Sequence, residues 1–224
     1  LDGGVLDTDL ILDHIWDEMR RYYANIVGKY GSPVQKALQK LSGLDIQMIC
    51  STHGPVWTKY IPEVVKIYDQ LSRYEGEDGV VLIYGSMYGN TEQMAEAIAS
   101  SLSAHGVKKI VVHNVSKSHS SYILKDLFKY KGVIIGCPTY CNQLYPEVDS
   151  LLSKIELREL KNRKFGYFGS FSWAGAAVKR LAAFAEKMKW EVVGEPVEQK
   201  QGLQPDKYEA CWKLGEEMAT AINN

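Results

Sequence analysis

The residues best suited to chemistry in this sequence form a short polar loop, Ser86-Met87-Tyr88-Gly89-Asn90-Thr91. The loop follows an apolar run of strand length and precedes a segment with helical spacing of apolar residues. The first turn of a helix offers unpaired N–H groups and the positive end of the helix dipole, which together suit a phosphate. Gly89 lets the backbone come close to a bound phosphate. Short polar side chains are added by Ser86, Asn90 and Thr91. Considered alone, the loop is explained equally well by an ordinary helix N-cap.

The composition of this loop argues against two other kinds of nucleotide site. It contains no Lys or Arg, and the lysine of G-x-x-x-x-G-K-[ST], which a nucleoside triphosphate requires, is absent. The G-x-G-x-x-G pattern of dinucleotide sites is absent as well. We therefore expect one terminal phosphate, held by neutral donors.

A second loop, from Cys137 to Gln143, leaves another apolar run. Proline stiffens the exit of this strand, Tyr140 supplies a flat ring, and amide groups here could meet the pyrimidine edge of a flavin. A simple turn ahead of the helix that starts near Pro146 is the alternative. The candidate binding residues are Pro138, Thr139, Tyr140, Cys141, Asn142 and Gln143.

A third loop, Gly169–Gly175, holds Trp173 among small residues. Exposing an indole is unfavourable unless something flat covers it, either a ligand ring or a neighbouring element. Packing of Trp173 against the protein itself is thus the alternative to a ligand contact. The candidate binding residues are Ser170, Phe171, Ser172, Trp173, Ala174 and Gly175.

The elements that must position these loops alternate strictly between strand and helix, which indicates crossover connections and a parallel sheet covered on both faces. The expected strands are residues 80–84, 109–113, 133–136, 165–168 and 191–193, the last resuming at 197–199. The expected helices are residues 91–104, 121–128, 147–155, 176–187 and 206–222. The alternation therefore indicates the α/β class. Among such sheets we expect the flavodoxin-like one, five parallel strands in the order 2-1-3-4-5, an order that alternation alone does not fix.

The loops after the first, third and fourth strands meet at one edge of such a sheet, where ligands bind. Flavin mononucleotide (FMN) needs three things at such an edge: a loop that binds its phosphate, polar groups that hydrogen-bond to the edge of its ring, and an aromatic side chain that covers the ring. A phospho-aspartate receiver domain shares this topology but needs carboxylates after strand one and an Asp after strand three. Those places hold Gly85-Ser86 and Cys137-Pro138, so we reject the receiver.

The N-terminal third of the chain has a different pattern, mostly helical. Helices are expected over residues 10–27, 33–41 and 62–73 and a short strand over 46–50, with Gly28 and Gly31 as breaks between helices. Ser32 is the expected N-cap, and Pro33 stands at the first helical position. The polar segment 75–79 is the best boundary, which gives two domains, residues 1–76 and 77–224.

Composition limits the function classes. The 224 residues are 46% hydrophobic and 24% charged, with a formal net charge of -1, so we expect no nucleic-acid partner and no membrane partner. The spacing of the four cysteines is not that of a C-x-x-C site, which favours reduced thiols in a cytoplasmic protein. Because the first residue is Leu1, we expect a piece of a longer polypeptide.

With these loops in view, the sequence resembles the flavodiiron proteins, or A-type flavoproteins. Ser86–Thr91 looks like their phosphate loop and Pro138–Gln143 like their first ring loop. Gly169–Gly175, followed by Ala177-Val178-Lys179, looks like their second ring loop. Cys141 stands where Asn is expected and Ser172 where Gly is usual, which bears on the flavin potential rather than on binding.

The resemblance extends to the N-terminal third of the chain. Trp16–Tyr23, Lys29–Leu38 and His53–Trp57 are similar to the end of the family's metallo-β-lactamase-like domain. His53 matches the family's last iron ligand. Without the resemblance, a lone His before Gly-Pro is more often a loop residue.

The resemblance implies an oxidoreductase that reduces O2 or NO at a di-iron centre, with FMN relaying electrons from a rubredoxin-type or similar donor. It also implies a head-to-tail homodimer that brings the FMN of one subunit close to the irons of the other. The remaining iron ligands lie upstream in the family and are not in this sequence. We therefore expect FMN on this chain and a di-iron centre only in the intact protein, and we expect no residue to serve as a nucleophile or general base.

Two alternatives remain open. One is a stand-alone FMN electron carrier with a helical N-terminal extension, and the other is an FMN-dependent quinone reductase. The His-Gly-Pro-Val-Trp segment at His53–Trp57 favours the flavodiiron interpretation, because a simple carrier has no use for it.

Overall fold

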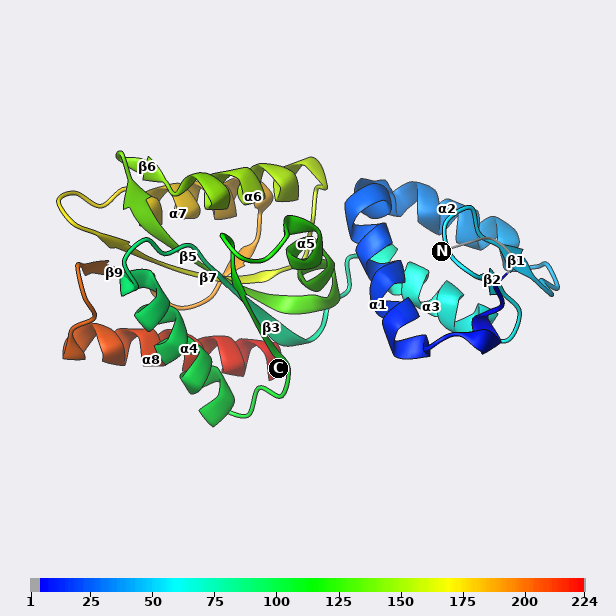
Figure 1. Ribbon diagram of the computed structural model, residues 1–224, viewed down its shortest axis with the longest axis horizontal. Helices are drawn as coiled ribbons and strands as arrows, with labels where there is room; N and C mark the ends of the chain where they lie inside the picture. The colour runs from blue at the N-terminus through cyan, green and yellow to red at the C-terminus, as the bar shows by residue number, and fades with distance from the viewer. Residues whose placement is uncertain (1–4, 224) are drawn as a thin grey trace.

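The computed structural model describes residues 5–223 and shows a parallel sheet between two layers of helices, with a mostly helical region at one end (Figure 1). The strands of the sheet are β3 (Glu77–Tyr84), β4 (Ile110–Asn114), β5 (Tyr130–Tyr140), β7 (Lys164–Phe171), β8 (Glu191–Val192) and β9 (Val197–Lys200), and β6 (Gln143–Leu144) pairs with the end of β5. The helices that cover the sheet are α4 (Asn90–Ala104), α5 (Ser120–Lys129), α6 (Pro146–Leu157), α7 (Ala177–Met188) and α8 (Pro205–Asn223).

The strand order β4-β3-β5-β7-β8, all parallel, confirms the expected order 2-1-3-4-5. β8 and β9 both pair in parallel with β7, so they form one interrupted fifth strand, as the sequence indicates. Since all these strands run the same way, the ends of β3, β5, β7 and β9 lie at one edge of the sheet.

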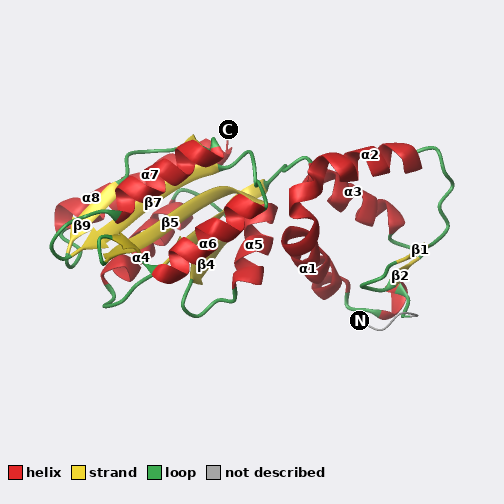
Figure 2. Cartoon of the chain, turned by 90° about the horizontal axis from the view of Figure 1, so that it is seen from above, coloured by secondary structure: helices red, strands yellow, loops and turns green. Residues whose placement is uncertain are grey.

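Alternation along the buried strands divides the core between the two faces of the sheet. Val81 and Ile83 of β3 belong to the cluster under α5, α6 and α7, whereas Val80 and Leu82 belong to the cluster under α4 and α8. Figure 2 shows these helix layers along the strands. Burial on both faces explains why the strands read as continuous apolar runs.

The N-terminal region consists of helices around a small hairpin. Its elements are η1 (Asp7–Asp9), α1 (Leu12–Tyr22), the π-helical turn η2 (Tyr23–Val27), the 3-10 turn η3 (Gly28–Tyr30), α2 (Gly31–Leu41), β1 (Ile49–Cys50), β2 (Val56–Trp57) and α3 (Ile61–Ser72). The expected domains span residues 1–76 and 77–224. Residues 1–4, which include Leu1, and residue 224 lie outside the described residues.

Two expectations for the N-terminal region were wrong. Gly28 and Gly31 do not break the helical path, since η2, η3 and α2 follow one another directly, and α2 begins at Gly31 with Tyr30, not Ser32, as its N-cap. The glycines serve close packing instead. A Cβ on Gly28 would lie 2.6 Å from the Phe128 ring and one on Gly31 2.4 Å from the Ser72 carbonyl oxygen.

Contacts cross the expected boundary near residue 76, although the N-terminal region also has a small buried cluster of its own at Ile15, Trp57 and Val64. Tyr23 and Ala24 of η2 are fully buried in the same cluster as Phe128 of α5. Lys125 of α5 forms an ion pair with Asp17 of α1 at 2.6 Å. The helical region is therefore packed into the α5 side of the sheet domain.

The third strand is longer than expected. β5 continues to Tyr140 and turns back through β6, with Tyr140 opposite Gln143. Cys141 and Asn142 between them have φ values of 48° and 57°. They form a two-residue turn with positive φ at both positions, which suits a hairpin.

No helix within residues 5–223 has the combination of length and apolar character required to cross a bilayer.

Candidate functional site

The phosphate loop leaves β3 and enters α4 at Gly89. Gly89 has φ of +88°, and its N–H donates to Ser86 Oγ at 3.1 Å. No side chain caps the start of α4, so its first N–H groups are free to bind an anion. A side chain on Gly89 would meet open space. The positive φ, rather than crowding, therefore calls for glycine here.

The three predicted loops are joined by hydrogen bonds between their side chains and backbones. Thr91 Oγ1 lies 2.8 Å from Ser170 Oγ, which joins the first loop to the third. Thr139 Oγ1 accepts from the N–H groups of Ala176 and Ala177 at 3.0 and 3.1 Å, which joins the second to the third. Thr139 thus caps the start of α7.

Large side chains around this edge are exposed, although the Tyr140 ring lies edge-on to the Tyr145 ring with 6.5 Å between centroids. Trp173 is 93% exposed, Tyr88 85%, Tyr140 44% and Met87 39%. This rules out the alternative that Trp173 packs against the protein within this chain. An edge with an uncapped helix start and uncovered aromatic rings fits a flat ligand with an anionic tail.

The remaining predicted residues also lie at this edge. Pro138 of β5 is opposite Ser170 of β7 in the sheet, and Phe171 ends β7. A Cβ on Gly175 would lie 2.4 Å from Glu198 Oε1, so glycine keeps this loop close to β9. Asn90 and Thr91 begin α4, and Ser172 and Ala174 lie in the loop between β7 and α7.

Burial raises the pKa of the Cys137 thiol to about 12. A thiol that stays protonated near neutral pH is a poor nucleophile. All four cysteines are free.

Sequence reasoning missed two polar residues next to the phosphate loop. Tyr84, at the end of β3, donates to Glu92 Oε1 at 2.5 Å, and burial first, then Glu92, raise the pKa of Tyr84. Gln199 of β9 is only 4% exposed, and its Oε1 has no hydrogen-bond partner. Neither could be found from spacing, because their relation to the loop depends on strand neighbours.

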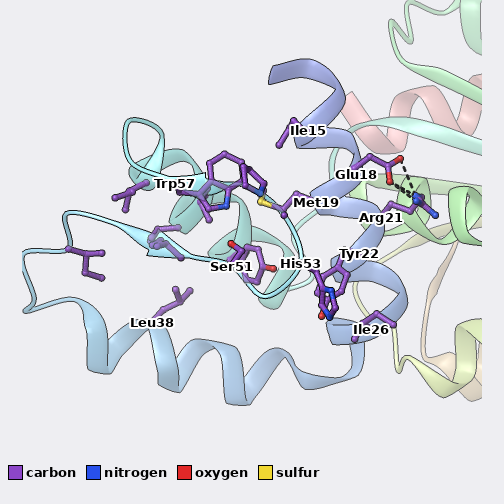
Figure 3. Close-up of a pocket in the computed structure, with 18 of the residues that line it drawn as sticks. Ile15, Glu18, Met19, Arg21, Tyr22, Ile26, Leu38, Ser51, His53 and Trp57 are labelled. Atoms are coloured by element: carbon purple, nitrogen blue, oxygen red, sulfur yellow. Dashed lines mark hydrogen bonds and ion pairs between the residues drawn. The ribbon is translucent and has the colours of Figure 1, made fainter. Parts of the chain in front are cut away.

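His53 lies in the helical region of the molecule, between β1 and β2. Its ring is 5.5 Å from the Tyr22 ring, tilted by 42°. It lines a cavity of about 1140 Å³ whose walls carry apolar side chains such as Ile15, Met19 and Trp57 (Figure 3). Among residues 5–223 no group of three or more His, Cys, Asp or Glu could hold a metal ion.

The turn after the His53 segment is fixed by Asp7. Its Oδ2 accepts from the N–H groups of Thr58, Lys59 and Tyr60 at 2.9–3.0 Å. Burial alone would raise the pKa of Asp7, but the hydrogen bonds from Tyr60 and Thr58 outweigh it and hold the pKa below its ordinary value.

Residues 82–215 match the family described as Flavodoxin. The chain therefore belongs to the flavodoxin family. An archaeal flavodoxin structure matches 65% of this chain and 99% of its own length, with 18% identity and a TM-score of 0.58, which shows the fold alone. The matched region, residues 82–215, contains all three loops.

The likeness extends beyond that domain. Rubredoxin oxygen:oxidoreductase from Desulfovibrio gigas is 28% identical and covers 98% of this chain and 55% of its own, with a TM-score of 0.92. The flavodiiron protein of Giardia intestinalis shows the same fold at 23% identity, with a TM-score of 0.94 over 99% of this chain and 55% of its own.

Anaerobic nitric oxide reductase flavorubredoxin from Enterobacter sp. is 30% identical over 221 residues, 97% of this chain and 46% of that protein. The chain spans about half the length of the curated relatives that it matches. It corresponds to the C-terminal portion of a flavodiiron protein.

Proposed function

We propose that residues 77–224 bind FMN at the edge formed by the ends of β3, β5 and β7, and that they serve electron transfer in a flavodiiron oxygen or nitric oxide reductase. The observation that carries this proposal is the convergence of the loops. An uncapped helix start and exposed aromatic rings are held together by the Thr91–Ser170 and Thr139–Ala176 hydrogen bonds.

When bound, FMN supplies one- and two-electron chemistry, while the protein supplies binding, orientation and electrostatics. The N–H groups at the start of α4, that of Thr91 among them, and the hydroxyl of Ser86 would hold the phosphate. Tyr140 and Trp173 would flank the ring and keep water from its faces. Backbone groups of the hairpin tip at Cys141 and Asn142 would meet the polar edge of the ring.

The placement of the two candidate sites supports a head-to-tail homodimer as part of the proposal. Figure 1 shows the ends of β5 and β9 at one end of the molecule and the region with β1 and β2 at the other. An FMN at the sheet edge is thus remote from His53 of the same chain. A second copy arranged head to tail would place the two next to each other, with His53 as one iron ligand.

The cavity beside His53 supports the proposal that further protein belongs there. Its walls combine apolar side chains of α1, α2 and α3 with charged ones such as Glu18, Arg21 and Asp45. We infer that the upstream portion of the metallo-β-lactamase-like domain, with the remaining iron ligands, covers it. A rubredoxin-type protein or similar donor would supply the electrons.

The experiment that tests the FMN proposal is a titration of the flavin-free protein with FMN, followed by flavin fluorescence and visible absorption. We expect one FMN per chain, with quenched fluorescence because Tyr140 or Trp173 contacts the ring. A preparation that stays colourless at excess FMN would refute the proposal.

A stand-alone FMN carrier is the second candidate, favoured by the archaeal flavodoxin that matches only 65% of this chain. Loss of flavin binding or of folding on deletion of residues 1–76 would not separate the two, since Tyr23 is in the shared core. Oxygen uptake by the intact protein with a reduced rubredoxin does separate them, because a carrier alone consumes little oxygen. Rapid quinone reduction by NAD(P)H would instead favour the quinone reductase.

A further inference from the structure

Three buried polar side chains lie directly behind the phosphate loop. Thr91 is 1% exposed and Ser170 5%, and their hydroxyl oxygens are 2.8 Å apart. Gln199 stands opposite Ser170 in the pairing of β7 with β9. Side chains opposite each other in a sheet point to the same face, so Gln199 faces the start of α4 as Ser170 does.

The neighbouring residues of β9 agree with this placement. Val197, two positions before Gln199 and therefore on the same face, packs in the cluster with Met94 and Ile98 of α4. A Cβ on Gly202, just after β9, would lie 3.9 Å from Asn90 Oδ1. The end of β9 thus flanks the phosphate loop.

The hydrogen bonds within this group are incomplete. Two hydroxyls that share one hydrogen bond leave one hydroxyl hydrogen for another acceptor. Gln199 Oε1 is buried without a partner, and its Nε2 donates only to the carbonyl oxygen of the next residue, Lys200, at 2.5 Å. The Gln199 carboxamide is thus buried with an unused acceptor oxygen, and its only donated hydrogen bond is a short one to the adjacent residue. Such a buried, incompletely bonded group calls for an explanation.

We propose that Gln199 is a further binding residue for the anionic end of the flavin. When the ligand binds, the carboxamide turns away from the Lys200 carbonyl oxygen; its Nε2–H then donates to the phosphate group, and its Oε1 accepts the hydroxyl hydrogen left over from the Thr91–Ser170 pair. The proposal rests on the proposed function of the sheet edge and adds a residue outside all three loops. It also supplies another neutral donor to a loop without Lys or Arg.

The test compares the affinities of the flavin-free protein for FMN and for riboflavin, which lacks the phosphate. Gln199→Leu should weaken FMN binding about tenfold, the contribution of one hydrogen bond to a charged group, and should leave riboflavin binding unchanged. Gln199→Glu should weaken FMN binding further, since a carboxylate offers no donor and repels phosphate. Gln204→Leu, an exposed glutamine at the end of the same connection, is the control and should change neither.

Any result other than the expected one contradicts either this proposal or the proposed function, and the two cases can be told apart. Unchanged FMN affinity in Gln199→Leu, or an equal loss for both flavins, overturns it and leaves FMN binding at the edge intact. If the wild-type chain binds neither flavin, the proposed function itself fails.

A second measurement covers the case in which Gln199→Leu does not fold. Inorganic phosphate should raise the thermal midpoint of the flavin-free wild-type protein, and the near-isosteric Gln199→Glu variant should lose that rise. A rise of equal size in both proteins would overturn the proposal.

Discussion

At the scale of single residues, this edge of the sheet owes its properties to side chains that the protein leaves uncovered and to one backbone conformation. Trp173 is almost fully exposed, although an indole normally finds a partner. Gly89 adopts a conformation that other residues rarely adopt. The exposed indole is unfavourable without a ligand, whereas glycine adopts the positive φ of the loop without strain.

Replacing the indole tests the first feature. Trp173→Ala should weaken FMN binding by about 1–3 kcal/mol if the ring stacks as aromatic side chains do on bases. Flavin titration measures this loss. Trp212→Ala on α8, whose indole stacks on Tyr208 instead, is the control, and an equal effect of the two substitutions would exclude a specific role for Trp173.

Replacing the glycine tests the second feature. Gly89→Ala should lower stability by about 1–2 kcal/mol, since positive φ disfavours a side chain, and should also weaken FMN binding. Gly106→Ala is a matched control, because Gly106 has φ of +84° and open space around its Cβ but follows the other end of α4. Denaturation should show the same loss for both variants. Flavin titration should distinguish them, and equal FMN affinities would contradict the role of Gly89.

At the scale of elements, one buried arginine connects segments that are far apart in the sequence. The Arg163 guanidinium donates to the carbonyl oxygens of Leu127 and Phe128 at the end of α5 and of Tyr74 before β3. It also donates to those of Lys161 and Asn162. Burial lowers the pKa of Arg163 to about 9, which still leaves it charged at neutral pH.

Removing this group should destabilise the whole chain. Arg163→Met leaves buried carbonyl oxygens without donors, at a cost of about 3 kcal/mol or more in the free energy of unfolding. Urea denaturation measures the change, with Arg180→Met on the exposed start of α7 as control. A loss below about 1 kcal/mol would mean that water replaces the guanidinium.

At the scale of the whole molecule, the two candidate sites differ in completeness. The sheet edge has a full set of groups for a mononucleotide. The other end has His53, held near Tyr22 beside an open cavity. In the proposed function, the ligands that complete an iron site beside His53 come from protein beyond these residues.

The metal content of the 224-residue chain follows from this difference. A di-iron centre needs about half a dozen ligands, and we expect less than about one iron per chain after anaerobic incubation with ferrous iron, while FMN still binds. Elemental analysis beside the visible spectrum provides both numbers. About two irons per chain would contradict the expectation.

The sequence by itself determined the parallel sheet and the loops that follow its strands, whereas the strand order was expected from likeness to flavodoxin-like sheets. This was possible because burial on both faces and helical spacing are local signals, and parallel strands place their ends together wherever the topology is regular. The strand order is confirmed by the pairing of β3 with both β4 and β5.

Only the tertiary structure decided which residues contact one another, at that edge and elsewhere in the core. The packing of Gly28 on Phe128, the Thr91–Ser170 contact and the buried Gln199 each depend on segments distant in sequence. The hairpin at Cys141 and Asn142 was also missed, because these residues give a weaker turn signal than Asn-Gly. Local periodicity reports that a side chain is buried, but its partner is set by the neighbouring strand or helix.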